Sequence, residues 1–186
     1  REKHIPLFAL ESQDPVKDFD FLGITLQFEM CYTNVLQVLD LSGIPLHSED
    51  RTLEDPFVIG GGPCVYNPEP LAEFFDMFYI GEGETVYYEL MDVYKECKKA
   101  GKSRKEFLEA AAEIPGIYVP AFYDVSYKED GTIASFVPNN RHAKATITKE
   151  VVVNPDDATY IEKPLAPFIK VTQDRVVLEI MRGCIR

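Results

Sequence analysis

The sequence predicts an α/β protein with a parallel sheet at its centre. Three observations support this fold class: short apolar runs alternate with longer segments of helical periodicity, the order strand–helix occurs three times, and each apolar run leads into a polar or glycine-rich segment. This order is typical of βαβ units, whose crossovers are right-handed. The chain of 186 residues, 46% of them hydrophobic, has the length of about one domain and can bury a core.

The strands and helices follow from the spacing of the apolar residues. The expected strands are residues 20–27, 57–59 and 77–80. The first is a nearly continuous apolar run, as in strands that are buried on both faces of a parallel sheet. The expected helices are residues 33–42, 69–75, 84–100 and 103–113. Gly43 and Gly101 fit C-terminal caps, and Ser103 with Glu106 has the spacing of a capping box.

A β-rich region is predicted after residue 114. Runs of β-prone residues at 118–127 and 132–137 are joined by Asp130-Gly131, and Asp-Gly between strands predicts a hairpin. The remaining β-prone or extended segments are 147–153, 169–172 and 176–181, and a linker rich in Pro and Asp is expected over 154–167.

Composition and charge argue against several classes of function. The net charge is −12, whereas a surface for nucleic acid or anionic membranes needs a basic stripe. No stretch reaches the roughly 20 apolar residues of a membrane span. There is no signal peptide, and the chain starts with Arg1, as expected if an N-terminal part is missing. Four cysteines without C-x2-C spacing favour reduced thiols in the cytoplasm.

Three loops are expected to converge on one edge of the sheet. They follow the three strands at residues 25–29, 60–63 and 81–84. Ligands of open α/β sheets bind beyond the carboxyl ends of the strands, so these loops predict a ligand site. The alternative is that their glycines only permit tight turns. A dinucleotide is disfavoured, because Val86 stands where a G-x-G-x-x-G fingerprint starting at Gly81 needs glycine.

The end of the chain predicts a metal ligand. An apolar, β-branched run at 176–181 leads into an Arg-Gly pair and then Cys184. A strand that ends on a cysteine is a common way to present a thiolate to a metal, although a buried structural cysteine gives the same pattern. Cys31 and Cys97 occupy apolar helix positions and are expected in the core. None of the three histidines has the sequence context of a catalytic or metal site.

Several motifs point to one family. They are residues 21–27, 32–36, 60–64, 67–72 and 80–84, together with the Arg-Gly-Cys ending. These segments resemble the radical SAM proteins that carry an N-terminal cobalamin-binding-like domain. The resemblance implies that Cys184 is the first of three cysteines, spaced C-x3-C-x2-C, that hold a [4Fe–4S] cluster, with S-adenosylmethionine (SAM) on the open iron. It also implies a cobalamin-type site, since Thr25 and Leu26 resemble part of the Ser-x-Leu signal and residues 60–62 resemble the Gly-Gly signal.

The resemblance also implies how the chain is divided. Residues 1–114 would form part of a flavodoxin-like, cobalamin-binding-type three-layer domain, residues 115–167 a β-rich connector, and residues 168–186 the first strand of a radical SAM barrel. In the flavodoxin-like strand order, the strand at 20–26 lies beside the central first strand, which is absent from this chain. Its edge is therefore expected to be unpaired.

The predicted function is radical chemistry by a larger enzyme that uses a [4Fe–4S] cluster and SAM, of which this chain is an inactive fragment. The residues expected to contact a cofactor are Thr25, Leu26, Gly60, Gly61, Gly62, Gly81 and Gly83, with Cys184 as the metal ligand. Cobalamin binding stays open, because a flavodoxin-like domain without a corrinoid is equally compatible with the sequence. The expected partners are small-molecule cofactors, and the substrate is not identified. The rival hypothesis is a non-catalytic α/β module whose hairpin docks a partner protein.

Overall fold

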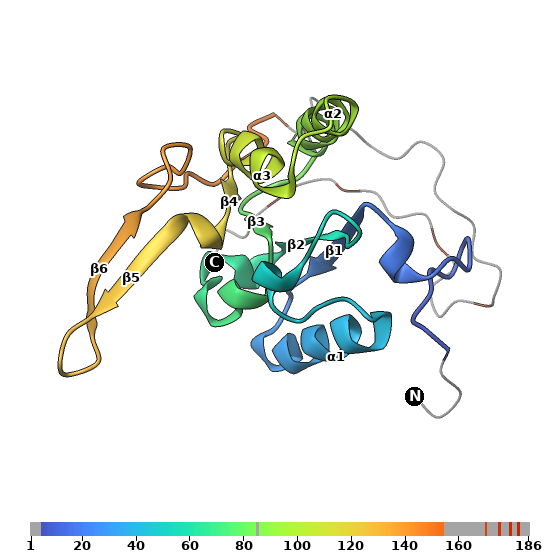
Figure 1. Ribbon diagram of the computed structural model, residues 1–186, viewed down its shortest axis with the longest axis horizontal. Helices are drawn as coiled ribbons and strands as arrows, with labels where there is room; N and C mark the ends of the chain where they lie inside the picture. Colours follow the sequence, from blue (N-terminus) through green and yellow to red (C-terminus); the bar gives the residue numbers. More distant parts are fainter. Residues whose placement is uncertain are drawn as a thin grey trace. The chain divides into compact units, whose positions relative to one another are not determined.

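A four-stranded sheet forms the centre of the computed structural model (Figure 1). The structure describes residues 5–84 and 86–154 and four isolated positions, 170, 175, 179 and 182. Contacts divide the chain into two units, residues 1–151 and 152–186. All the described helices and strands lie in the first unit.

The sheet is mixed, and most of its pairing is parallel. Its strands, in spatial order, are β1 (Phe21–Thr25), β2 (Phe57–Gly61), β3 (Met77–Tyr79) and β4 (Ile117–Tyr118). β1 and β3 both pair with β2 in parallel, and β4 pairs with β3 antiparallel. The predicted α/β class is therefore confirmed, as is the parallel pairing of the first three strands. The sequence pattern does not predict the antiparallel β4.

Helices cover both faces of this sheet and give three layers (Figure 1). α1 (Tyr32–Ser42) lies on one face, and α2 (Val86–Lys99) and α3 (Arg104–Ala112) lie on the other. Alternate residues of β2 supply the two cores, because Phe57 packs towards α2 and α3 whereas Val58 packs towards α1. β2 and β3 are buried, as expected of central strands with helices on both faces.

Local sequence signals set the ends of the helices. Gly43 ends α1 in the left-handed conformation, with a φ of 67°. At the start of α3 the Ser103 hydroxyl accepts from the Glu106 N–H, and the Ser103 N–H donates to the Glu106 carboxylate at 2.8 Å, which is the predicted capping box. The segment expected as a helix at 69–75 forms a 3₁₀ helix over Glu69–Phe74. None of the described helices combines the length and the apolar character needed to cross a bilayer.

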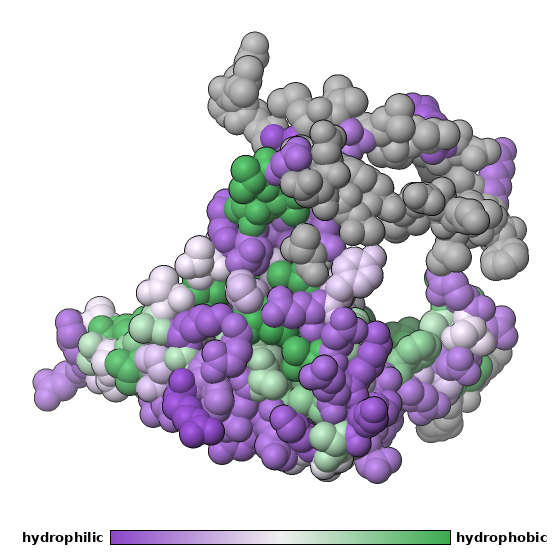
Figure 2. Space-filling model, turned by 90° about the horizontal axis from the view of Figure 1, so that it is seen from above, coloured by the Kyte–Doolittle hydropathy of each residue, from purple (hydrophilic) through white to green (hydrophobic). Residues whose placement is uncertain are grey.

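The predicted hairpin is confirmed. β5 (Tyr123–Tyr127) and β6 (Ile133–Pro138) pair antiparallel, and Gly131 in the turn has a φ of 80°. Asp130 stabilises the turn by accepting hydrogen bonds from the N–H and the hydroxyl of Thr132, at 3.0 and 2.6 Å. The hairpin extends away from the sheet, at the left of Figures 1 and 2, and its strands are largely exposed.

Two other β-strand predictions are wrong. The single strand expected at 118–127 is divided between β4 and β5, because Pro120 lacks the N–H of a central strand and starts a 3₁₀ turn. The strand expected at 147–153 forms only an isolated parallel bridge between Gly81 and Glu150. The rest of this β-prone segment finds no neighbouring strand among the described residues.

β1 is less buried than its apolar sequence predicts. Gly23 and Thr25 are exposed, and the other three residues are half-buried. The reason is position, because among the described residues β1 pairs with β2 alone and so lies at the edge of the sheet. The expected unpaired edge stays a prediction, because only part of the chain is described, whereas the expected burial on both faces is wrong.

Some predictions lie outside the described residues. They concern the linker beyond residue 154, the extended stretches at 169–172 and 176–181, and Cys184. The proposed domain boundaries near residues 114 and 167 stay predictions.

Candidate functional site

A cavity of about 240 Å³, here called the glycine cavity, lies at the carboxyl ends of β1, β2 and β3. Six of the seven residues predicted to contact a cofactor line it: Thr25, Gly60, Gly61, Gly62, Gly81 and Gly83. They come from three separate loops, which the parallel pairing of the strands brings to one edge of the sheet. The convergence expected from the sequence is therefore present, while cofactor binding stays a prediction.

The floor of the glycine cavity is bare backbone, because two glycines lie on the same face of the sheet. Gly23 pairs in register with Ile59, and Thr25 pairs with Gly61. Ile59 packs towards α2, so Gly61, two residues later in the strand, faces α2 as well. A Cβ added to Gly61 would meet no heavy atom within 4 Å, and one added to Gly23 would come no closer than 3.8 Å. The missing side chains thus create the space.

Two tyrosines that the sequence analysis does not single out form walls of the cavity. Tyr87, in the first turn of α2, lies over Gly83, where an added Cβ would be 3.1 Å from the ring. The Tyr87 hydroxyl comes within 3.9 Å of a Cβ built on Gly23. Tyr79 is buried at the end of β3, and its hydroxyl donates to the carbonyl of Glu82. The signal that could have identified Tyr87 is its place one helical turn after the third loop.

Other predicted glycines are explained by the backbone and by packing. Gly81 has a φ of 130°, and its added Cβ would lie 2.3 Å from the carbonyl oxygen of Glu150. Gly62 has a φ of 95°, which side chains rarely adopt. A Cβ on Gly60 would lie 2.5 Å from the ring of Phe78. At these three positions the backbone conformation or the packing requires glycine, as the alternative interpretation states. Gly61 has no such requirement.

Leu26 does not line the glycine cavity. Its side chain is buried in the core on the α1 side of the sheet, with 1% of its surface exposed. Its backbone positions the loop instead: the Leu26 N–H donates to Gly61 at 2.7 Å, and its carbonyl accepts from Cys64 at 3.0 Å. The structure thus separates Leu26 from the six lining residues, because the strand alternation turns it towards α1.

The charge near the glycine cavity is negative. No Lys, Arg or His side chain is among the described residues that line it. Burial raises the pKa of the Tyr79 hydroxyl, and the carboxylates of Glu150, Glu84 and Glu82 raise this pKa further. Tyr79 therefore stays protonated at neutral pH. A neutral or cationic ligand group suits these surroundings better than a phosphate or carboxylate.

Comparisons with known proteins assign the chain to a family. Residues 1–120 match the family described as "Radical SAM proteins, N-terminal". The chain belongs to this family. An uncharacterised protein of Methanocaldococcus jannaschii is 37% identical to the radical SAM chain over 87 residues, which are 45% of this chain and 18% of the relative's length. No solved structure matches the chain.

Membership of the radical SAM family implies an iron–sulfur cluster and SAM in the parent protein. The described part of the chain offers no complete metal site, since it contains no group of three or more His, Cys, Asp or Glu side chains that could hold a metal ion. Cys184, the predicted first cluster ligand, lies outside the described residues.

The three described cysteines of the radical SAM chain do not line the glycine cavity. Cys97 is buried in the core, as predicted. Cys31 is exposed, so its predicted core position is wrong; it ends a 3₁₀ turn before α1 and does not belong to the buried face of that helix. Cys64 is half-buried, and burial raises the pKa of its thiol, which disfavours the thiolate that metals bind.

Proposed function

We propose that this chain is the N-terminal portion of a cytoplasmic radical SAM enzyme and that Cys184 is the first of its three cluster ligands. The observation that supports this most strongly is the family match over residues 1–120. A second support is the apolar run and Arg-Gly pair that precede Cys184. When bound, the [4Fe–4S] cluster and SAM supply the electron and the sulfonium needed for radical chemistry.

The α/β part of the chain is proposed to bind a small-molecule group in the glycine cavity. Gly23 and Gly61 leave a floor of bare backbone, and the ring of Tyr87 lines the same cavity beside Gly83. This shape suits a planar ring that stacks on Tyr87. Thr25 lines the same space, and a threonine hydroxyl can donate to or accept from a ligand.

Cobalamin is one candidate ligand of the glycine cavity. The volume of about 240 Å³ is below the roughly 300–1,000 Å³ of typical ligand pockets, so the cavity can enclose one planar group of so large a cofactor. No histidine is among its described lining residues. The resemblance of residues 25–26 and 60–62 to cobalamin-binding signals supports this candidate. The alternative is a radical SAM enzyme whose N-terminal domain binds no corrinoid.

The cluster proposal is tested on the full-length protein, purified without oxygen. Iron and sulfide content and the EPR spectrum of the reduced protein are compared for the wild type, Cys184→Ala and Cys31→Ala. Loss of the cluster is expected in Cys184→Ala only, because Cys31 is exposed and lies far along the chain from the proposed site. A stoichiometric cluster in Cys184→Ala, or in residues 1–186 alone, contradicts the proposal.

The cavity proposal is tested by exposing the full-length protein to hydroxocobalamin, removing the excess and recording the absorbance that remains. Gly61→Val fills the floor of the cavity and is expected to weaken retention about tenfold or more. Ala121→Val places the same valine side chain at an exposed position outside the cavity and serves as the control. A wild-type protein that retains no corrinoid rules out cobalamin and leaves the radical SAM proposal standing.

A second candidate function is protein docking by the hairpin. Four large apolar side chains of the hairpin are exposed: Tyr127, Ile133, Phe136 and Val137. The hairpin lies at the left of Figure 2, where hydrophobic and hydrophilic residues are mixed on the surface. The open reading frame after Arg186 separates the two functions, because two further cysteines at the family spacing support the enzyme and their absence supports a docking module.

A further inference from the structure

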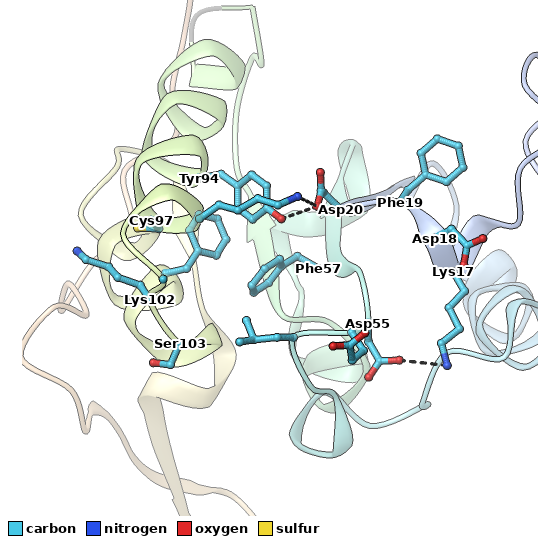
Figure 3. A pocket seen from close by; sticks show the side chains of 15 residues that line it. Lys17, Asp18, Phe19, Asp20, Asp55, Phe57, Tyr94, Cys97, Lys102 and Ser103 are labelled. Atoms are coloured by element: carbon cyan, nitrogen blue, oxygen red, sulfur yellow. Dashed lines mark hydrogen bonds and ion pairs between the residues drawn. The ribbon is translucent and has the colours of Figure 1, made fainter.

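A second cavity, here called the amino-end cavity, has a volume of about 700 Å³ and lies at the amino ends of β1 and β2 (Figure 3). Its described lining residues come from four segments: the stretch before β1, the loop before β2, α2, and the turn that leads into α3. The volume is within the roughly 300–1,000 Å³ of typical ligand pockets. Because the glycine cavity lies at the opposite end of the sheet, the two cavities are separate.

The inner wall of the amino-end cavity is aromatic. Phe57, Tyr94 and Phe107 pack edge to face, with ring centroids 4.6 to 6.0 Å apart. Two further lining residues, Phe19 and Leu53, are 41% and 65% exposed. A ligand whose apolar part covers these side chains removes their surface from water. The cavity therefore favours an organic ligand over an inorganic ion.

A lysine of the chain itself shows how this wall receives a cation. The Lys98 ammonium lies 5.5 Å from the centroid of the Tyr94 ring, which is within the range of a cation–π contact. The ammonium and the Tyr94 hydroxyl each donate to Oδ1 of Asp20 at 2.6 Å. These hydrogen bonds lower the pKa of the Asp20 carboxyl, so it is ionised at neutral pH. The Tyr94 ring and the Asp20 carboxylate together form a cation subsite.

The ammonium of Lys98 can leave the cation subsite at small cost. The side chains of Lys98 and Asp20 are 62% and 53% exposed. An exposed ion pair contributes little, because water screens it and the long lysine side chain loses freedom. A ligand ammonium makes the same contacts, and its apolar stem also buries the aromatic wall. This additional burial favours the ligand over Lys98.

The charge around the amino-end cavity favours a cation over an anion. Four acidic and three basic side chains are among its described lining residues. Lys98 is paired with Asp20, and Lys17 lies 3.6 Å from Asp55. Lys102 extends away from both aspartates (Figure 3). Two of the acidic lining residues are exposed and form no ion pair within the described part of the chain: Asp18 and Glu54.

We propose that the amino-end cavity binds a small organic cation, a primary ammonium on an aromatic or apolar stem. The ammonium takes the place of Lys98 on the Asp20 carboxylate and the Tyr94 ring, and the stem covers the aromatic wall. The site depends neither on the iron–sulfur cluster nor on a ligand in the glycine cavity.

Equilibrium dialysis of the full-length protein against phenethylamine tests the proposal. This probe joins a phenyl ring to a primary ammonium, and 3-phenylpropanoate carries a carboxylate on the same ring and chain. The wild type is expected to bind phenethylamine about tenfold or more tightly than 3-phenylpropanoate. Lys98→Met vacates the cation subsite and should tighten the binding of phenethylamine about tenfold. Asp20→Asn removes the carboxylate and should weaken this binding about tenfold.

Lys95→Met is the matched control, because it makes the same substitution in α2 at an exposed position outside the cavity. Its affinity for phenethylamine is expected to stay within about twofold of the wild type. Misfolding cannot explain tighter binding in Lys98→Met, since loss of folded protein lowers the amount bound.

Four results would overturn the proposal. They are no binding of phenethylamine by the wild type and Lys98→Met, equal affinity of the wild type for the two probes, no tightening in Lys98→Met, and equal tightening in Lys95→Met. The measurement needs neither cluster nor corrinoid, so this proposal and the proposed function fail separately.

Discussion

The carboxyl end and the amino end of the sheet differ in the charged side chains that the described residues place there. At the carboxyl end, no charged side chain is among the described lining residues of the glycine cavity, and its floor is bare backbone. At the amino end, three charged side chains form a buried cluster. Asp76 accepts a hydrogen bond from Arg51 Nη1 at 2.9 Å and forms an ion pair with Arg104 Nη2 at 2.8 Å. The side chains of Arg51 and Asp76 are 0% and 1% exposed.

The buried cluster joins segments that are far apart in the sequence. Arg51 also donates to the carbonyls of Pro45, Leu46 and Phe74, at 2.7 to 3.0 Å. Desolvation lowers the pKa of the Arg51 guanidinium, and the Asp76 carboxylate opposes that shift. The comparison teaches that charged side chains fix the chain at the amino end of the sheet, whereas the described residues that line the glycine cavity at the carboxyl end include none.

The largest expected effect is the removal of Asp76 from the buried cluster. Asp76→Ala leaves two arginines without their carboxylate and should lower the free energy of unfolding by about 3–5 kcal/mol. Asp92→Ala is the control, because the Asp92–Lys95 pair is more than 70% exposed on both sides and should contribute less than about 1 kcal/mol. Urea unfolding measures the free energy of unfolding of both variants. Equal decreases in the two variants would contradict the conclusion that the buried cluster stabilises the amino end of the sheet.

A smaller effect is expected from two adjacent glycines at the carboxyl end. Gly60→Ala places a Cβ 2.5 Å from the Phe78 ring and should destabilise the protein by about 1–3 kcal/mol through overpacking. Gly61→Ala meets no atom within 4 Å and should change the free energy of unfolding by less than about 0.5 kcal/mol. Thermal unfolding of the two variants checks whether the floor of the cavity is open. A large decrease in the free energy of unfolding of Gly61→Ala would show that the floor is filled.

The smallest effect concerns the pH dependence of Asp20. Hydrogen bonds from Lys98 and Tyr94 lower the pKa of this carboxyl below its ordinary value of 3.8. A depressed folded-state pKa stabilises the protein above the unfolded-state value, and this stabilisation is lost as the pH falls through the folded-state value. Asp20→Asn should therefore cost less than about 1 kcal/mol at pH 6, because Asp20 is half-exposed, and progressively less as the pH falls below 3.8. A cost that persists at the acid end of a urea titration would point to packing instead of charge.

Much of the fold could be predicted from the sequence, because its signals are local. The apolar runs identify β1, β2 and β3, and the Ser103–Glu106 capping box marks the start of α3. The Asp130-Gly131 pair marks the hairpin turn. The candidate site was predictable for a related reason: parallel strands bring their carboxyl ends to one edge, so six glycine or threonine positions in three loops could be placed together.

The rest was decided by the tertiary structure, because it depends on partners that are distant in the chain. Arg51 and Asp76 are paired across 25 residues, and no local pattern shows that they meet in the core. The antiparallel β4, the exposure of β1 and the burial of Leu26 likewise follow from which strands are neighbours. The sequence alone determined the turn of the hairpin and the capped ends of α1 and α3, because their signals are local. The packing of the sheet decided that the space above Gly61 is empty, whereas the space above Gly60 is filled by the ring of Phe78.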